Sequence, residues 1–155
     1  MAGTIDARLK ELGINLPEAA APAANYVPYV ISGNMVFVSG QITLENGELK
    51  HVGTVGDDME TEEAYLAARL CGLNLIAQIK AACNGDLDRV RRVVKLGGFV
   101  NCTPDFTDQP KVINGASDLM VEVFGDKGKH ARAAVGAPTL PLGVSVEIDG
   151  IFEIE

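Results

Sequence analysis

The sequence contains few of the residues that build disulfide frameworks or metal centres. It has only three cysteines and two histidines. Cys71, Cys83 and Cys102 are odd in number and form no Cys-x-x-Cys pair, so neither a disulfide scaffold nor a structural zinc site is expected. His51 and His130 have no partners at metal-ligand spacing, so no metal is expected. This cysteine usage indicates a reducing, cytoplasmic compartment.

Positive charge is also scarce. Thirteen basic residues stand against 21 acidic ones, and the net charge of −8 argues against a protein that holds nucleic acid by its phosphates. The densest basic stretch, Arg89-Val-Arg-Arg92, is short and has no interleaved aromatic residues. It is more typical of a solvated strand entrance than of an RNA-binding strip. Nucleic acid is therefore not an expected partner.

Long apolar runs are absent as well. No stretch approaches the roughly 20 apolar residues that span a bilayer, and the start, Met-Ala-Gly-Thr-Ile-Asp, lacks the basic and apolar segments of a signal peptide. No membrane association is expected. The chain has 155 residues, of which 47% are hydrophobic. This is enough for one hydrophobic core that needs no disulfide or metal cross-links.

Hydrophobic periodicity predicts an α+β fold. Residues 1–23 are expected to form an N-terminal extension, a short helix and an Ala/Pro-rich linker, ahead of a main domain over 24–155. Two helices with one mixed sheet would leave one sheet face covered and the other bare. The predicted elements after the extension are strands over 26–31 and 35–44, a helix from 58 or 61 to 83, a strand over 91–102, a helix from 107 or 108 to 124, and strands over 131–135 and 144–154.

Local signals support these elements. Gly40 interrupts the second strand, where a β-bulge would be natural. The long helix has an acidic first turn and an apolar stripe, and Asn84-Gly85 ends it. The next helix takes Pro110 in its first turn and ends at Gly125. The stripe of the long helix consists of Leu66, Leu70, Leu73 and Ala77.

The last 26 residues predict a β-hairpin with opposite charges facing each other. From Val144 to Ile154, apolar and polar residues alternate, which is the pattern of a half-buried strand. A symmetric turn about Thr139 and Leu140 would put Arg132 directly across from Glu147, with Cβ atoms roughly 5 Å apart. Both would lie on the bare sheet face, beside Ser145 and Ala134. Such a pair is either a salt bridge or a small-anion site.

Motifs along the main domain resemble the RidA family of imine and enamine deaminases, some of whose members were earlier described as endoribonucleases. The resemblance covers residue 24 to the end. The Ser-Gly-Gln-Ile motif and the Arg…Pro…Val-x-Val-Glu spacing are fairly specific together. The markers are Val27-Pro-Tyr-Val30, Gly33-Asn-Met-Val-Phe-Val-Ser-Gly-Gln-Ile42, Phe99-Val100, Asp105-Phe106, Asn114, and Ala131-Arg132 ahead of Glu147.

This resemblance implies a chorismate-mutase-like (ferredoxin-like) α/β fold assembled as a homotrimer. The sheets of the three subunits would form a central β-barrel, with ligand clefts between neighbouring subunits. It also implies hydrolytic release of ammonia from reactive 2-imino or enamine acids, giving 2-oxo acids without metal or organic cofactor. The expected ligand is therefore a small 2-imino or 2-oxo carboxylate.

By position in the motifs, the resemblance assigns Arg132 to the substrate carboxylate and Glu147 to the attacking water. A guanidinium suits a carboxylate because its planar fork donates two parallel hydrogen bonds, and a carboxylate can take a proton from water. The plain alternative is a cross-strand ion pair worth little if exposed. The residues expected to line the pocket are Tyr29, Ser39, Gly40, Asn114 and Ala134.

The pocket residues have simpler explanations too. Tyr29 could belong to the core or to an interface, Ser39 could bond its own backbone, and Asn114 could face solvent. Typical deaminases have a cysteine where this chain has Ala134, of which only the backbone N–H could serve the site. Two other functions therefore remain: a non-catalytic trimeric binding or regulatory protein for small carboxylates, and an endoribonuclease.

Overall fold

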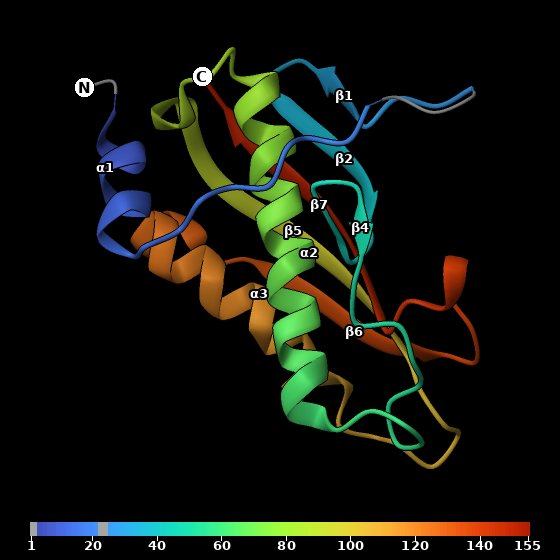
Figure 1. The fold of residues 1–155 in the computed structure, drawn as a ribbon. Helices are drawn as coiled ribbons and strands as arrows, with labels where there is room; N and C mark the ends of the chain where they lie inside the picture. The colour runs from blue at the N-terminus through green and yellow to red at the C-terminus, as the bar shows by residue number, and fades with distance from the viewer. Residues whose placement is uncertain (1–2, 22–24) are drawn as a thin grey trace.

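The computed structural model describes residues 3–21 and 25–155. A five-stranded mixed sheet, in the order β1-β2-β7-β5-β6, forms the centre of the domain (Figure 1). The predicted boundary between residues 23 and 24 lies outside the described residues. The sheet strands are β1 (Tyr29–Ser32), β2 (Met35–Gln41), β5 (Val90–Asn101), β6 (Ala131–Ala137) and β7 (Val146–Ile154), with a small separate hairpin of β3 (Leu44–Glu45) and β4 (Glu48–Leu49).

Two long helices, α2 (Thr61–Ala82) and α3 (Gln109–Phe124), cover one face of this sheet, as predicted (Figure 1). Their closest approach depends on Gly115, because a Cβ there would overlap with the backbone carbonyl of Tyr65. Helices that approach this closely carry small residues at the contact. The buried core between helices and sheet includes Leu75, Ile79, Ile113, Leu119, Ile148 and Phe152.

Most predicted elements are confirmed. β1 and β2 form the predicted hairpin, and the β2–β7 register shifts between Val38 and Gln41, around the predicted bulge at Gly40. Helix α2 ends before Asn84 and Gly85, whose positive φ angles of 54° and 90° cannot continue a right-handed helix. One member of the predicted stripe is wrong, because Leu66 is 53% exposed.

The predicted C-terminal hairpin is also wrong. β6 lies parallel to β5, with Arg132 beside Leu96, and β7 lies antiparallel on the other side of β5, with Glu147 opposite Phe99. β5 therefore separates the two strands. The chain between β6 and β7 is no tight turn, because it includes the 3₁₀ turn Pro141–Gly143, where Leu142 has a φ of 59°.

Arg132 and Glu147 consequently do not face each other. Two inter-strand steps and a three-residue offset place their Cα atoms roughly 14 Å apart. Arg132 contacts α3 on the helix-covered side of the sheet, whereas Glu147 lies beside Gly40 and Asp149 on the other side. Ser145 is completely buried and Ala134 packs against the core. The prediction that both lie on the bare face is therefore wrong.

The face of the sheet opposite the helices is bare in the isolated chain, as predicted, and partly apolar. The cross-strand row Val30–Phe37–Ile151–Lys95–Ala131 crosses all five strands. Large apolar side chains on this face are open to solvent: the exposed fractions of Val30, Phe37, Phe99 and Val135 are 53%, 45%, 37% and 47%. We refer to it below as the open face.

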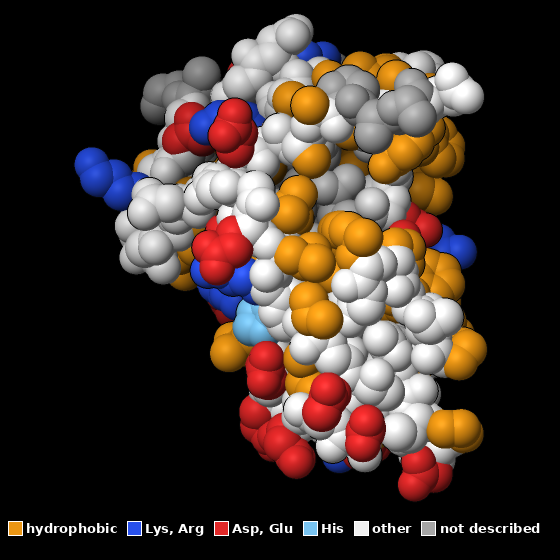
Figure 2. All heavy atoms as spheres, turned by 45° about the vertical axis from the view of Figure 1, so that its right-hand side comes forward, with side chains coloured by type: hydrophobic (Ala, Val, Ile, Leu, Met, Phe, Trp, Pro, Cys, Tyr) orange, Lys and Arg blue, Asp and Glu red, His pale blue; other side chains and the backbone are white. Residues whose placement is uncertain are grey.

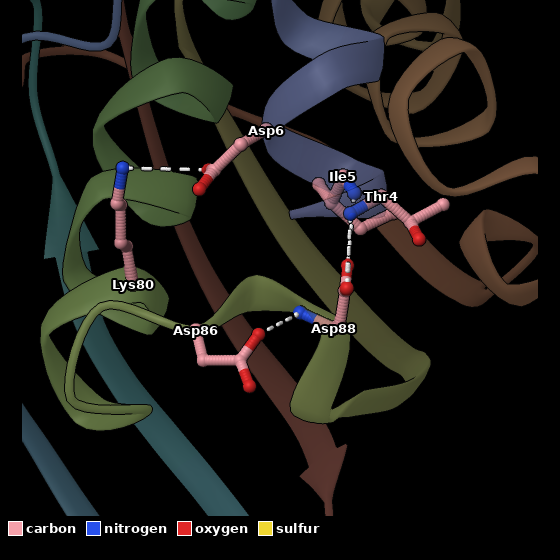
Figure 3. A network of polar contacts seen from close by, with 6 residues as sticks. All are labelled: Thr4, Ile5, Asp6, Lys80, Asp86 and Asp88. Carbon is pink, nitrogen blue, oxygen red and sulfur yellow. Dashed lines mark hydrogen bonds and ion pairs between the residues drawn. The ribbon is translucent and has the colours of Figure 1, made fainter. Parts of the chain in front are cut away.

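The N-terminal helix α1 (Thr4–Glu11) packs onto the domain through Leu9, which belongs to the same buried core. Its first turn is held by Asp88, whose carboxylate accepts hydrogen bonds from the backbone N–H groups of Thr4 and Ile5 at 2.9 and 2.8 Å (Figure 3). An exposed ion pair between Asp6 and Lys80, at 3.4 Å, joins the same helix to α2. The N-terminal segment is thus tied to the domain at several points.

The three cysteines are buried free thiols. No helix in the described part of the chain is long and apolar enough to cross a membrane.

Candidate functional site

The Arg132 side chain reaches from the edge strand β6 to helix α3. Its Nη1 atom donates to the Oδ1 atom of Asn114 at 2.8 Å and to the Oγ atom of Ser117 at 3.2 Å. Asn114 and Ser117 lie one turn apart on α3, so they share a helix face. The structure therefore brings together Arg132 and Asn114, two of the residues predicted for the site.

These two bonds leave one edge of the guanidinium available. Nη1 has two N–H groups, and each has an acceptor. Across residues 3–21 and 25–155, neither Nε nor Nη2 of Arg132 has a hydrogen-bond partner, and the side chain takes part in no ion pair. The Nε–Nη2 edge is one of the two sides of the guanidinium that can bind a carboxylate with two parallel bonds. Arg132 is thus anchored by one nitrogen and open to a ligand at the other two.

Glu147 occupies the open face with Asp149, two residues further along β7. Burial raises the pKa of the Glu147 carboxyl above its ordinary value, and the negative charge of Asp149 raises it further. The pKa of Asp149 is raised by burial as well. Gly40 lies so close to Glu147 that a Cβ there would overlap with the carboxylate. Glu147 and Gly40 are therefore neighbours on the open face.

The remaining predicted residues are engaged in the fold. Ser39 donates from its hydroxyl to the backbone carbonyl of Val27 at 2.8 Å, so it bonds a neighbouring chain segment and not its own backbone. Tyr29 is half-buried on the edge strand β1 and packs against the core. Ala134 packs against the core from β6, two residues from Arg132 and on the same side.

Ser39 and Gly40 also line a cavity of about 490 Å³. Its other walls come from residues 18–21 of the N-terminal segment, from α2 and from the β3–β4 hairpin. Two buried amides of α2 hold these walls: Asn74 donates to the carbonyls of Ile42 and Leu44, and Gln78 donates to the carbonyl of Ala20. Sequence reasoning missed both, although polar residues four apart on the apolar side of a helix are a usable signal.

Within one chain, the predicted residues form two separate groups. Arg132, Asn114 and Ala134 lie at β6 and α3, on one side of the sheet. Glu147 and Gly40 lie at β7 and β2, on the other. Since β1 and β6 are the two edges of the sheet, Tyr29 and Arg132 are separated by its full width.

Acidic side chains gather at one end of the molecule, where α2 begins (Figures 1 and 2). The segment from Asp57 to Glu63 contributes five exposed acidic residues there. Such a surface repels a phosphate backbone. No three His, Cys, Asp or Glu side chains of the described residues lie close enough together to hold a metal ion.

A mixed sheet with two helices on one face and the other face open is the arrangement of the chorismate-mutase-like α+β proteins. Residues 6–152 match the family described as "YjgF/chorismate mutase-like, putative endoribonuclease", and the chain belongs to this YjgF/RidA family. The match begins inside α1, so it includes most of the N-terminal extension.

Several relatives span nearly the whole chain. Protein TCP17 of Trypanosoma cruzi is 50% identical over 153 residues, which cover 98% of this chain and 95% of that protein. The crystal structure of Atu1372 from Agrobacterium tumefaciens, a protein with unknown function, has 54% identity and a TM-score of 0.92, covering 97% and 92% of the two chains. A 2-iminobutanoate/2-iminopropanoate deaminase of Dermatophagoides farinae is 30% identical over 143 residues, covering 92% and 95%.

Proposed function

We propose that this protein hydrolyses small 2-imino or enamine acids to 2-oxo acids and ammonia, in the cytoplasm and without a cofactor. The observation that carries the proposal is the Arg132 guanidinium, which α3 anchors by Nη1 while its Nε–Nη2 edge has no partner among the described residues. A fixed planar fork of this kind suits a carboxylate. The related deaminase acts on substrates that carry one.

The chemistry needs one group that moves a proton. With the carboxylate of the protonated imine (iminium) on Arg132, a water molecule adds to the C=N carbon, and the carboxylate of Glu147 takes one proton from this water, which leaves a hydroxyl and an amine on the same carbon. The protonated Glu147 then gives this proton to the amine nitrogen. The C–N bond breaks, Glu147 takes the hydroxyl proton as the C=O bond forms, and this proton passes to the departing ammonia, which leaves as ammonium. A carboxyl with a raised pKa suits these steps, because it holds and releases a proton nearer neutral pH.

Arg132 and Glu147 must come from different chains to act on one substrate, because in a single chain they lie on opposite sides of the sheet. We propose that three copies associate through their open faces, with the β6 edge of one copy beside the β1–β2 edge of the next. The exposed Val30, Phe37, Phe99 and Val135 support this assembly, since apolar patches of this kind mark protein interfaces. Each cleft would then combine Arg132 of one copy with Glu147, Gly40 and Tyr29 of its neighbour.

The test is direct. An amino-acid oxidase generates 2-iminobutanoate or 2-iminopropanoate in place, and the loss of the imine is followed with and without the protein. We expect faster loss with the wild-type chain and no acceleration with Arg132→Ala. A panel of imino acids that all decay at the spontaneous rate would overturn the proposal; binding of 2-oxo acids without turnover would instead identify a carboxylate-binding protein. RNA cleavage that survives repurification and is lost in Arg132→Ala would support an endoribonuclease.

A further inference from the structure

The hydrogen bonds that anchor Arg132 continue beyond Ser117. The Oγ atom of Ser117 lies 2.9 Å from Nε2 of His130, and Nδ1 of His130 lies 2.6 Å from the backbone carbonyl oxygen of Gly128. Arg132, Ser117, His130 and Gly128 therefore form one chain of contacts across β6, α3 and the 3₁₀ turn Gly125–Gly128. Spacing in the sequence predicted only that His130 has no metal-ligand partners.

When His130 is neutral, the hydrogen bonds between these four residues can have only one order of donors and acceptors. A carbonyl can only accept, so Nδ1 of His130 carries the ring proton and donates to Gly128. Nε2 is then an acceptor and takes the hydroxyl proton of Ser117. The lone pairs of the Ser117 oxygen are left for the N–H of Arg132 Nη1. Every donor in the series thus has an acceptor.

The far end of the chain is fixed by packing. Gly128 is buried, and a Cβ at this position would overlap with the backbone carbonyl of Met120 on α3. The 3₁₀ turn therefore rests directly on the helix backbone, which only glycine allows. This contact sets where the Gly128 carbonyl lies, and with it the orientation of the His130 ring.

Two bonds to Nη1 fix the guanidinium more completely than one. With Asn114 alone, the plane could rotate about the single Nη1–Oδ1 contact. With Ser117 as a second acceptor in a different direction, the plane is set, and the Nε–Nη2 edge points one way. Ligand binding is stronger when a site is ordered beforehand, since less conformational freedom is lost.

We infer that Ser117 and His130 are positioning residues, which hold Arg132 so that its Nε–Nη2 edge is presented to the carboxylate of the ligand. This inference rests on the proposed function, because it assumes that Arg132 binds a carboxylate. Neither residue touches the reacting atoms. Their contribution belongs to binding, and the proton transfers stay with Glu147.

The test compares matched variants in the full-length protein. Ser117→Ala and His130→Ala are expected to raise both KM for the imino acid and Kd for 2-oxobutanoate about tenfold, with kcat within about twofold of wild type. Ser117→Thr keeps the hydroxyl and should restore KM to within about twofold. His51→Asn is the control, since His51 contacts Glu63 instead and asparagine tolerates its positive φ of 51°. The control should not change KM.

A second measurement does not depend on turnover. The Nε–H resonance of Arg132 should be sharp in the wild-type protein and broadened or shifted in Ser117→Ala, where the side chain gains freedom. His130→Gln replaces His130→Ala in both measurements if the alanine variant does not fold.

The outcomes separate the two proposals. Unchanged binding and turnover in Arg132→Ala would overturn the proposed function itself. If Arg132→Ala loses binding and turnover while Ser117→Ala and His130→Ala behave like the His51→Asn control, only the positioning role is overturned. A fall in kcat at constant KM would also contradict it.

Discussion

At the scale of single residues, Gly40 and Gly97 form a matched pair on the open face. A Cβ at Gly40 would overlap with the carboxylate of Glu147, and a Cβ at Gly97 would overlap with that of Asp149. In both cases the obstructing atoms belong to the end of a flexible side chain, so the fold can adjust by moving the carboxylate. Gly40→Ala should therefore displace Glu147 with a change in Tm of about 2 °C or less.

We expect Gly40→Ala to lower kcat for imine hydrolysis by about tenfold or more, because displacing a catalytic group by about 1 Å is costly. Gly97→Ala is the control: it moves the neighbouring carboxylate by the same kind of overlap and should leave kcat within about twofold. Steady-state kinetics and thermal unfolding of both variants measure the two effects separately. Equal losses of kcat in the two variants would contradict a special role for Glu147.

Replacing Glu147 by glutamine should separate activity from stability. The pKa of Glu147 is raised by burial and then by Asp149, so the folded protein binds this proton more tightly than the unfolded chain does. The charged carboxylate therefore lowers the stability of the folded state above its folded pKa, and this effect disappears as the pH falls through that value. Glutamine has no such charge at any pH.

Glu147→Gln should accordingly raise Tm at pH 8 by about 1–2 °C, and the difference from wild type should vanish near pH 4. The same variant should lose about 100-fold or more of kcat. Thermal unfolding across pH 4–8 and imine hydrolysis at pH 8 are the measurements. If Glu147→Gln is less stable than wild type at pH 8, the charged Glu147 carboxylate does not destabilise the folded state.

At the scale of elements, the docking of α1 should depend on the charge of Asp88. Burial raises the pKa of Asp88, but hydrogen bonds from the N–H groups of Ile5 and Thr4 outweigh it, and the pKa lies below its ordinary value. The stabilisation is therefore fully present above about pH 4, the ordinary pKa of aspartate, and is lost as the pH falls through the lower folded value. Figure 3 shows how the carboxylate faces the first turn of the helix.

Hydrogen exchange of the α1 amides, corrected for intrinsic rates, measures this docking. We expect faster exchange in Asp88→Asn than in wild type at pH 7, and convergence of the two as the pH falls through the lowered pKa of Asp88 in the folded protein. Asp6→Asn is the control, because it removes only the exposed pair with Lys80, which is worth little. Exchange that is equally fast in both variants would contradict the assignment to Asp88.

Elements could be predicted from the sequence more reliably than their pairing. Alternation identified β7, and periodicity identified α2 and α3, because each depends on which side of one element is buried. The alternation of apolar and polar residues in one strand does not show which other strand is its neighbour in the sheet. β6 follows α3, and a helix is the usual connection between two parallel neighbouring strands, as β5 and β6 are here. This connection leaves the second edge of β6 open, so the sequence alone does not exclude a hairpin with β7. The position of β7 between β2 and β5 depends on how the whole sheet packs.

At the scale of the whole molecule, the wrongly predicted β6–β7 hairpin also led to a wrong prediction of the geometry of the site. The motif positions of Arg132 and Asn114 led to side chains that do lie together. Adjacency of Arg132 and Glu147 failed, because it was derived from a pairing across a loop that includes a residue in the left-handed region, Leu142. Ser117 and His130 could not be found from spacing, since they meet only when α3 and the 3₁₀ turn pack together.

A site completed by a second copy makes a quantitative prediction about mixtures. Arg132→Ala and Glu147→Gln should each be inactive as homo-oligomers. If every cleft takes its arginine from one copy and its glutamate from another, an equal mixture that exchanges subunits at random should have both wild-type residues in about one quarter of its clefts. Imine hydrolysis by the mixture should therefore recover to about one quarter of wild-type activity. Analytical ultracentrifugation of the wild-type chain should show a trimer, and Phe37→Asp should dissociate it by placing a charge on the open face. An equal mixture that stays inactive after proven subunit exchange would mean that both residues must come from one chain, which the two sides of the sheet do not allow without rearrangement.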